Sequence, residues 1–331
     1  MSRLASVGAA PHEARFVRRL AICSLGLLAV ACGGEPPKAA DSAATATPTQ
    51  AAADTAVPPS TEGLKVPESV RYDAALDAYF VSNIDGIPNQ KDNNGFIVRL
   101  DAGNPSAPVD VVRGGVKGVT LNAPKGMAIA GDTLWVADID VVRAFNKNTG
   151  ETLATIDLST MGATFLNDVA IAADGTVYVT DTGIRFSDKG ELSHPGKDRI
   201  FAIAGGKASV AIENDSLLTR PNGIAWDGTN ARFILAGFGG PDVTAWKPGE
   251  KTVTKLASGP GSYDGLEVLG DGRILVTSWA DSSLSLVANG AVTKVKGGLE
   301  APADIGVDTK RQRVAVPRFN AGRVDYIAIP K

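Results

Sequence analysis

Beyond residue 65 the chain alternates short apolar runs with polar turn residues, and the period of two is typical of β-strands. The clearest segments are LNDVAIAADGTVYVTDT at 166–182 and YDGLEVLGDGRILVTSW at 263–279. In each segment an Asp-Gly pair separates two alternating runs, which predicts a tight hairpin turn. Because no amphipathic helical period accompanies these runs, the pattern predicts an all-β domain.

The same unit recurs in four further copies, which begin at Pro67, Ala123, Arg220 and Ala301. Six copies at a spacing of roughly 38 to 56 residues predict a six-bladed β-propeller of four-stranded antiparallel blades over 65–331. A single blade leaves its faces exposed, so we expect one cooperative ring. Two segments compete to complete the last blade: the residues before Glu68 and the C-terminal residues 325–329.

The N-terminal part of the chain has a different character. Three arginines precede an apolar run at 20–31 that is too short to span a bilayer and has the length of a secretory signal core. The run ends in LLAVAC, which resembles a bacterial lipobox. We therefore expect a signal peptide at 1–31, followed over 32–64 by an acylated Cys32 and a disordered tether rich in Ala, Thr and Pro. The alternative is an ordinary signal peptide with a cysteine near its cleavage site.

A lipobox implies an envelope protein, anchored to the membrane by lipid. Gly33 follows the cysteine, and this favours the outer membrane, with the domain facing the periplasm. The chain carries 33 basic and 36 acidic residues, and loss of the leader removes four basic residues but one acidic residue. An acidic domain without a basic stripe excludes nucleic acid as a partner. Since Cys23 lies in the leader, we expect no disulfide, and we expect a monomer.

Four oxygen-bearing residues, Glu68, Asn167, Asn222 and Asp264, each open a different copy of the repeat. A radial repeat aims this position at its central axis, so ring closure predicts that the four side chains meet. Two carboxylates and two amide oxygens form a hard ligand set that suits calcium or another divalent cation. The alternative is that these turn-forming residues only satisfy neighbouring backbone groups.

Two copies carry different residues at the same position, Lys125 and Ala303. Oxygen ligands are therefore placed selectively, as a binding site requires. We expect Lys125 to point to solvent, and the alternative is that it offsets negative charge near the axis.

The motifs PES at Glu68, LND at Asn167, PNG at Asn222 and YDG at Asp264 together resemble the senescence marker protein, gluconolactonase and luciferin-regenerating enzyme family. They are also similar to the wider six-bladed group that includes diisopropyl fluorophosphatase and paraoxonase. The resemblance implies that these four residues hold a calcium ion, and that Asp264 also acts as base or nucleophile. Where gluconolactonases commonly carry a sugar-binding arginine, this chain has Phe165, so a sugar lactone is disfavoured.

Several residues are expected near the mouth of the same pocket. Phe165, Phe238, Trp279 and Phe319 suggest an apolar rim, although aromatic residues also pack between blades. The paraoxonase-like histidine pair is missing; outside the leader the chain has His194. That histidine lies in the long loop at 182–199, which we expect on the same face as a lid, together with the loop at 84–95.

Together these features predict a calcium-dependent hydrolase that acts on a small-molecule lactone, ester or organophosphate. The alternative is a non-catalytic propeller that serves as a binding scaffold in the envelope, since fold alone does not decide function.

Overall fold

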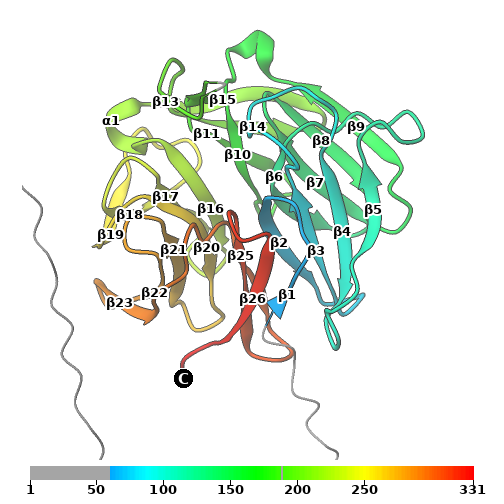
Figure 1. Ribbon diagram of the computed structural model, residues 1–331. Coiled ribbons are helices and arrows are strands. Elements are labelled where there is room, and N and C mark those ends of the chain that lie inside the picture. The colour runs from blue at the N-terminus through cyan, green and yellow to red at the C-terminus, as the bar shows by residue number, and fades with distance from the viewer. Residues whose placement is uncertain (1–59, 188) are drawn as a thin grey trace, which may run out of the picture. The chain divides into compact units, whose positions relative to one another are not determined.

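The computed structural model describes residues 60–187 and 189–331, and nearly all regular structure in these ranges is β (Figure 1). The predicted signal peptide, Cys32 and most of the tether lie outside the described residues. Helical structure within them is limited to the single turn α1 (Asp215–Leu218) and the 3₁₀ turn η1 (Ser159–Met161). No helix in this part of the chain is long and apolar enough to cross a membrane.

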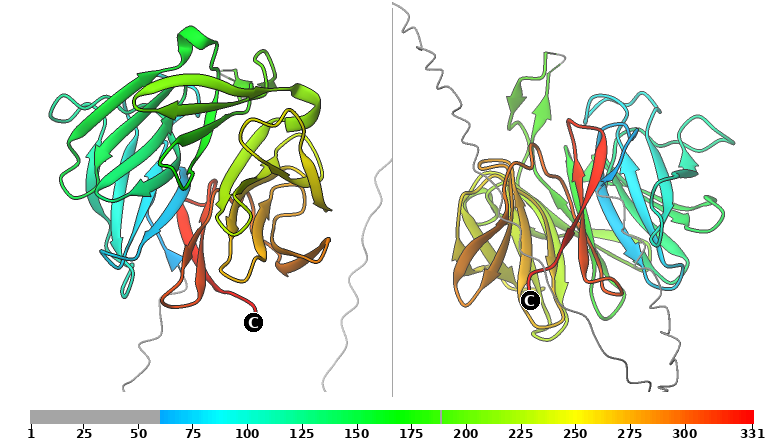
Figure 2. Two further views of the ribbon diagram at one scale, coloured as in Figure 1. Left: turned by 180° about the vertical axis from the view of Figure 1, so that it is seen from behind. Right: turned by 60° about the horizontal axis from the view of Figure 1, so that its bottom comes forward.

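Six four-stranded antiparallel sheets follow one another around a ring (Figures 1 and 2). Blade 1 contains β2 (Pro67–Asp73), β3 (Ala78–Asn83), β4 (Phe96–Asp101) and β5 (Val109–Arg113). Blade 2 contains β6 (Pro124–Ala130), β7 (Thr133–Asp138), β8 (Val141–Asn146) and β9 (Thr152–Asp157). Blade 3 contains β10 (Leu166–Ile171), β11 (Val177–Asp181), β14 (Arg199–Ala204) and β15 (Lys207–Glu213). Blade 4 contains β16 (Pro221–Asp227), β17 (Arg232–Gly237), β18 (Asp242–Trp246) and β19 (Thr254–Ser258). Blade 5 contains β20 (Tyr263–Val268), β21 (Ile274–Ser278), β22 (Ser283–Ala288) and β23 (Ala291–Lys296). The predicted six-bladed propeller is confirmed.

Blade 6 closes the ring with strands from both ends of the domain. From the axis outward it contains β24 (Gly306–Asp308), β25 (Arg313–Arg318), β26 (Arg323–Ala328) and β1 (Ser60–Thr61). Figure 1 shows β1, in blue, beside the red β26, and Thr61 pairs with Val324. The Thr61 hydroxyl is buried and lies 2.8 Å from the Tyr326 hydroxyl. Both candidate segments therefore take part in closure, and the propeller extends to Ser60, on the N-terminal side of residue 65.

The hydrophobic core is divided among the interfaces between successive blades. Phe80 of blade 1 and Phe145 of blade 2 are fully buried in one apolar cluster, and Phe233 and Trp246 belong to the cluster between blades 3 and 4. Each of the other four blade interfaces holds a comparable cluster. Since each blade buries its faces against its neighbours, the ring is expected to unfold cooperatively.

The innermost strands approach one another closely around the axis, and glycine makes this possible. A Cβ atom on Gly126 would lie 2.4 Å from the Cα of Asp168 on the next blade. A Cβ atom on Gly265 would lie 2.3 Å from the Cα of Asp304. Neither separation is sterically allowed, so these positions require the absence of a side chain.

Irregular pairing at the start of the inner strands turns side chains toward the axis. The register of β2 against β3 shifts between Pro67 and Ser69, and β6, β10, β16 and β20 show the same shift near their first residues. A bulge of this kind leaves its residues out of the regular ladder and redirects their side chains. Glu68, Asn167, Asn222 and Asp264 all lie within these shifts.

We predict that Gly265→Ala lowers the free energy of unfolding by about 1–3 kcal/mol, because the new methyl group overpacks the axis. Gly270→Ala is the matched control, since nothing lies within 4 Å of the Cβ that it would add. Urea unfolding followed by tryptophan fluorescence measures both variants. Equal stability of the two variants would mean that the approach of the inner strands at Gly265 leaves room for a side chain, contrary to our inference.

Candidate functional site

One cavity of about 240 Å³ at the axis contains all four predicted axial residues. Glu68, Asn167, Asn222 and Asp264 project from β2, β10, β16 and β20, and each is at most 5% exposed. Residues separated by almost 200 positions in the sequence are thus brought to one buried place. The structure shows the convergence that the repeat pattern predicts.

Several oxygen atoms in this cavity lack a hydrogen-bond partner among the described residues. They are Glu68 Oε2, Asn222 Oδ1 and Asp264 Oδ1, all of which are buried. Asn167 donates its Nδ2 to Thr182 Oγ1 at 3.0 Å, which fixes the orientation of its amide. Buried polar atoms are normally paired, so these oxygens suit a cation or a hydrogen-bond donor in the cavity.

The donor set fits a hard divalent cation better than a soft one. All four side chains offer oxygen, and among the described residues no group of three or more His, Cys, Asp or Glu side chains is placed to hold a metal. Only Glu68 and Asp264 contribute carboxylates to the quartet. A cation here would therefore depend on the amide oxygens of the two asparagines as well, as calcium sites do.

Electrostatics in the cavity also favour a cation. Burial raises the pKa of Glu68 well above its usual range, and the negative charges of Asp264 and Asp304 raise it further. Burial is also the main reason that the pKa of Asp264 is raised, followed by Asp304, while Trp279 favours the charged form. Among the described residues, the Trp279 indole N–H nevertheless has no partner at ordinary hydrogen-bond geometry. A bound dication would remove the cost of ionising both acids.

Four residues that precede axial positions have strained backbone conformations. Val66, Arg220, Ser262 and Ala301 have φ values of 52°, 59°, 45° and 44°, in the left-handed region that glycine normally occupies. Each residue lies two positions before an axial residue. Such conformations cost roughly 1 kcal/mol or more per residue and tend to persist at functional sites.

Lys125 is buried, which corrects the expectation that it points to solvent. Its side chain is 1% exposed and lines the cavity. The Nζ atom donates to Ala123 O at 3.1 Å and lies 4.3 Å from the centre of the Phe165 ring. Burial lowers the pKa of Lys125 to about 8, although Glu68 acts in the opposite direction. The structure agrees with the alternative, in which Lys125 lies near negative charge at the axis.

The walls of the cavity are apolar and include four of the predicted rim residues. Phe165, Phe238, Trp279 and Phe319 all line it. The ring centres of Phe238 and Trp279 are 5.6 Å apart, and those of Trp279 and Phe319 are 5.5 Å apart. Sequence reasoning missed further lining residues, namely Ile84, Pro88, Ile184, Phe186 and Leu192. These residues lie in the two loops proposed as lids, where no periodic pattern identifies an inward-facing side chain.

His194 is not among the residues that line the cavity, although the sequence placed it near the substrate. Its Nε2 atom lies 2.7 Å from Asp198 Oδ1 within the same loop. Asp198 in turn accepts a hydrogen bond from the backbone N–H of Arg220, next to the inner strand of blade 4. The histidine therefore braces the loop that carries it.

The two predicted lid loops meet over the cavity. The loop at 182–199 contains a small hairpin of β12 (Arg185–Phe186) and β13 (Leu192–Ser193), which rises above one face of the ring (Figure 2). The backbone N–H of Phe186 donates to Asn89 Oδ1 in the blade 1 loop at 3.0 Å. Phe186 and Leu192 both line the cavity. The loops thus close part of its mouth.

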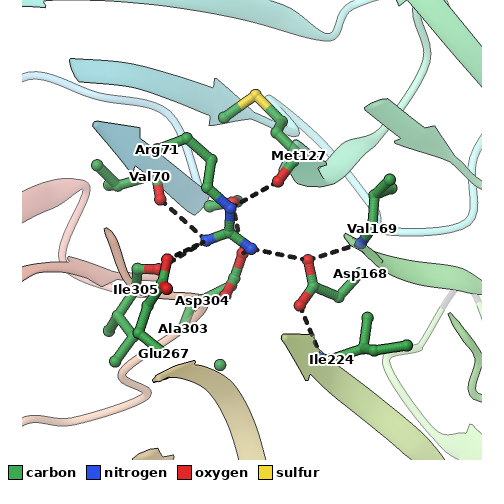
Figure 3. Close-up of polar contacts among 12 residues, drawn as sticks. Val70, Arg71, Met127, Asp168, Val169, Ile224, Glu267, Ala303, Asp304 and Ile305 are labelled. Atoms are coloured by element: carbon green, nitrogen blue, oxygen red, sulfur yellow. Dashed lines mark hydrogen bonds and ion pairs between the residues drawn. The ribbon is translucent and has the colours of Figure 1, made fainter. Parts of the chain in front are cut away.

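Below the cavity, one arginine occupies the axis (Figure 3). The Nη2 atom of Arg71 lies 2.9 Å from Asp168 Oδ1 and 2.9 Å from Asp304 Oδ2. Both carboxylates are almost fully buried, and they directly follow the axial positions of Asn167 and Ala303. Arg71 also lies 3.7 Å from Glu267, whose pKa burial raises to about 7. We call Arg71, Asp168 and Asp304 the lower tier, and the cavity quartet the upper tier.

The lower tier connects all six blades. Arg71, in blade 1, donates to Met127 O in blade 2 at 2.6 Å and to Ile305 O in blade 6 at 2.6 Å. Asp168 in blade 3 accepts the backbone N–H of Ile224 in blade 4 at 2.9 Å, and Glu267 belongs to blade 5. The guanidinium therefore fixes the inner strands that present the upper tier.

Removal of divalent cations should make stability depend on the upper-tier acids. Their pKa values are raised in the folded protein, so the folded state retains protons that the unfolded chain releases above pH of about 4. This contribution lowers stability as pH rises. In chelator, Asp264→Asn should therefore raise the melting temperature relative to wild type, and by more at pH 7.5 than at pH 5.

Calorimetric melting in the presence of chelator measures this difference, with Glu151→Gln as a control at an exposed acid. If the difference in melting temperature between Asp264→Asn and wild type shrinks as pH rises, the inference that the pKa of Asp264 is raised in the folded protein is wrong.

Comparison with known proteins places the chain in a family. The family model described as "SMP-30/Gluconolactonase/LRE-like region" matches residues 109–304, more than half of the chain, and this range includes Asn167, Asn222 and Asp264. No curated protein matches the chain. A chain in a solved nidogen/laminin complex is similar at 15% identity and a TM-score of 0.54, covering 69% of this chain and 79% of its own. That likeness shows the fold alone. The family match, in contrast, covers most of the ring, and the chain belongs to the SMP-30/gluconolactonase/LRE-like family.

Proposed function

We propose that the protein is a divalent-metal-dependent hydrolase that acts on an ester, lactone or organophosphate, with calcium as the cation. The observation that carries this proposal is the set of unpartnered, buried oxygens of Glu68, Asn222 and Asp264 at the floor of an apolar cavity. Membership in a family whose name includes gluconolactonase supports hydrolysis. The apolar wall favours a hydrophobic substrate over a sugar.

The chain's own residues have distinct parts in this scheme. When bound, a divalent cation polarises a carbonyl or phosphoryl oxygen. Asp264 is the base or nucleophile, because its buried Oδ1 is unpartnered and burial makes the carboxylate more basic. Asn167 orients the substrate through an amide that Thr182 fixes. Phe238, Trp279 and Phe319 exclude water from the reacting group.

Calcium titration calorimetry tests the metal half of the proposal. We expect Asp264→Asn and Glu68→Gln each to weaken binding by at least about tenfold, because each substitution removes a charged ligand. Glu151→Gln serves as the surface control. Unchanged affinity in both cavity variants would refute the upper tier as the site.

Hydrolysis assays test the reaction. Aryl esters, lactones and phosphotriesters are offered with calcium and with chelator, and we expect turnover of at least one class that chelator and Asp264→Asn abolish. Inactivity toward all three classes under both conditions would favour the alternative function, a binding propeller of the envelope.

We also propose lipid anchoring through Cys32, and the LLAVAC sequence supports it. Cys32→Ser should move the protein from the membrane fraction to the soluble fraction of the expressing bacterium, with no change in the melting temperature of the propeller. Retention of the variant in the membrane fraction would contradict this anchor.

A further inference from the structure

Lys125 is a buried ammonium without a carboxylate partner. Among the described residues it has no ion pair within 4 Å, and its contacts are one hydrogen bond to Ala123 O and the face of Phe165. An ammonium has three donors, so this arrangement uses one of them. Leaving a buried charge under-partnered is costly, and it is usually explained by a ligand that completes its contacts.

The charges in the cavity point to the sign of that ligand. Glu68, Lys125 and Asp264 are the charged residues that line it. A divalent cation would balance the two carboxylates, and the lysine would then leave the loaded cavity with an excess of one positive charge. An anionic group on the substrate would neutralise this excess.

Position also separates the lysine from the proposed reacting centre. Lys125 enters from blade 2, whereas Asp264 enters from blade 5, on the far side of the six-bladed ring. Phe165 lies against Lys125, and Trp279 lies beside Asp264. A substrate with a charged end at Lys125 and a scissile bond at Asp264 would lay an apolar body along the aromatic wall.

We propose that Lys125 determines specificity by binding a carboxylate of the substrate, so that the preferred substrates are esters or lactones with an apolar body and a free carboxylate. This inference rests on the proposed function for the reaction. To the proposed reaction it adds the chemical class of the preferred substrate. The binding of the carboxylate itself does not require that the bond be cleaved.

Paired substrates of equal length test the proposal with the calcium-loaded protein. We expect kcat/KM for 4-nitrophenyl hydrogen adipate to exceed that for 4-nitrophenyl hexanoate by about 10- to 100-fold, the range for one buried charge-assisted hydrogen bond. Lys125→Met should abolish this preference, mainly through KM, and Lys125→Arg should retain part of it. Phe238→Leu is the control, which should change both substrates alike.

A binding measurement keeps this test independent of catalysis. Calorimetric titration with adipamic acid and with hexanamide, neither of which is an ester, should show the same preference for the carboxylate in wild type and its loss in Lys125→Met. If neither ester is cleaved but this binding preference is found, the proposed hydrolysis fails and the assignment of Lys125 holds.

Two results would overturn the role of Lys125. One is the absence of any preference in wild type, which decides the matter even if the variants do not fold. The other is an equal preference in wild type and Lys125→Met, which would mean that the carboxylate binds the metal. A role limited to offsetting Glu68 predicts the first of these results, because neither protein would then prefer the carboxylate. It also predicts that Lys125→Met binds calcium more tightly.

Discussion

The guanidinium of Arg71 lies between two buried carboxylates on the axis of the ring, and the rest of the site depends on this contact. Burial raises the pKa of both Asp168 and Asp304, and the positive charge of Arg71 acts in the opposite direction. The flat, forked guanidinium bonds both of them and reaches backbone carbonyls on neighbouring blades. One interaction therefore offsets part of the negative charge on the axis and aligns the inner strands.

The upper tier is built on the same strands but lacks an internal cation of this kind. Its two carboxylates have raised pKa values, and three of its oxygens have no partner among the described residues. Lys125 lies close enough to lower the pKa of Glu68, but it forms no ion pair with it in the structure. The two tiers therefore differ in their charge partners. The carboxylates of the lower tier share the guanidinium of Arg71, although Asp304 Oδ1 has no hydrogen-bond partner among the described residues, whereas the carboxylates of the upper tier form no ion pair there.

Much of this arrangement was predictable from the sequence, because it follows from repetition. Asp-Gly turns and alternating runs indicate the blades. Because equivalent positions in a ring converge on its axis, Glu68 and Asp264 are expected in the same place although they are far apart in the sequence. The sequence named both segments of blade 6, and an axial place for Lys125, only as alternatives, and it did not choose between them. The bracing of His194 by Asp198 was not predictable, because neither composition nor period contains a signal for such side-chain contacts. Arg71 was overlooked for the same reason, since one arginine on a strand ordinarily indicates a solvated face.

The number of divalent cations bound to each chain tests the two-tier account most directly. Equilibrium dialysis against calcium, followed by elemental analysis, measures this number in the intact protein. The account predicts one ion, because Arg71 already occupies the lower tier and the upper tier has unpaired oxygens for a single cation. No bound ion would contradict the assignment of the upper tier, and two bound ions would contradict the inference that Arg71 takes the place of a cation in the lower tier.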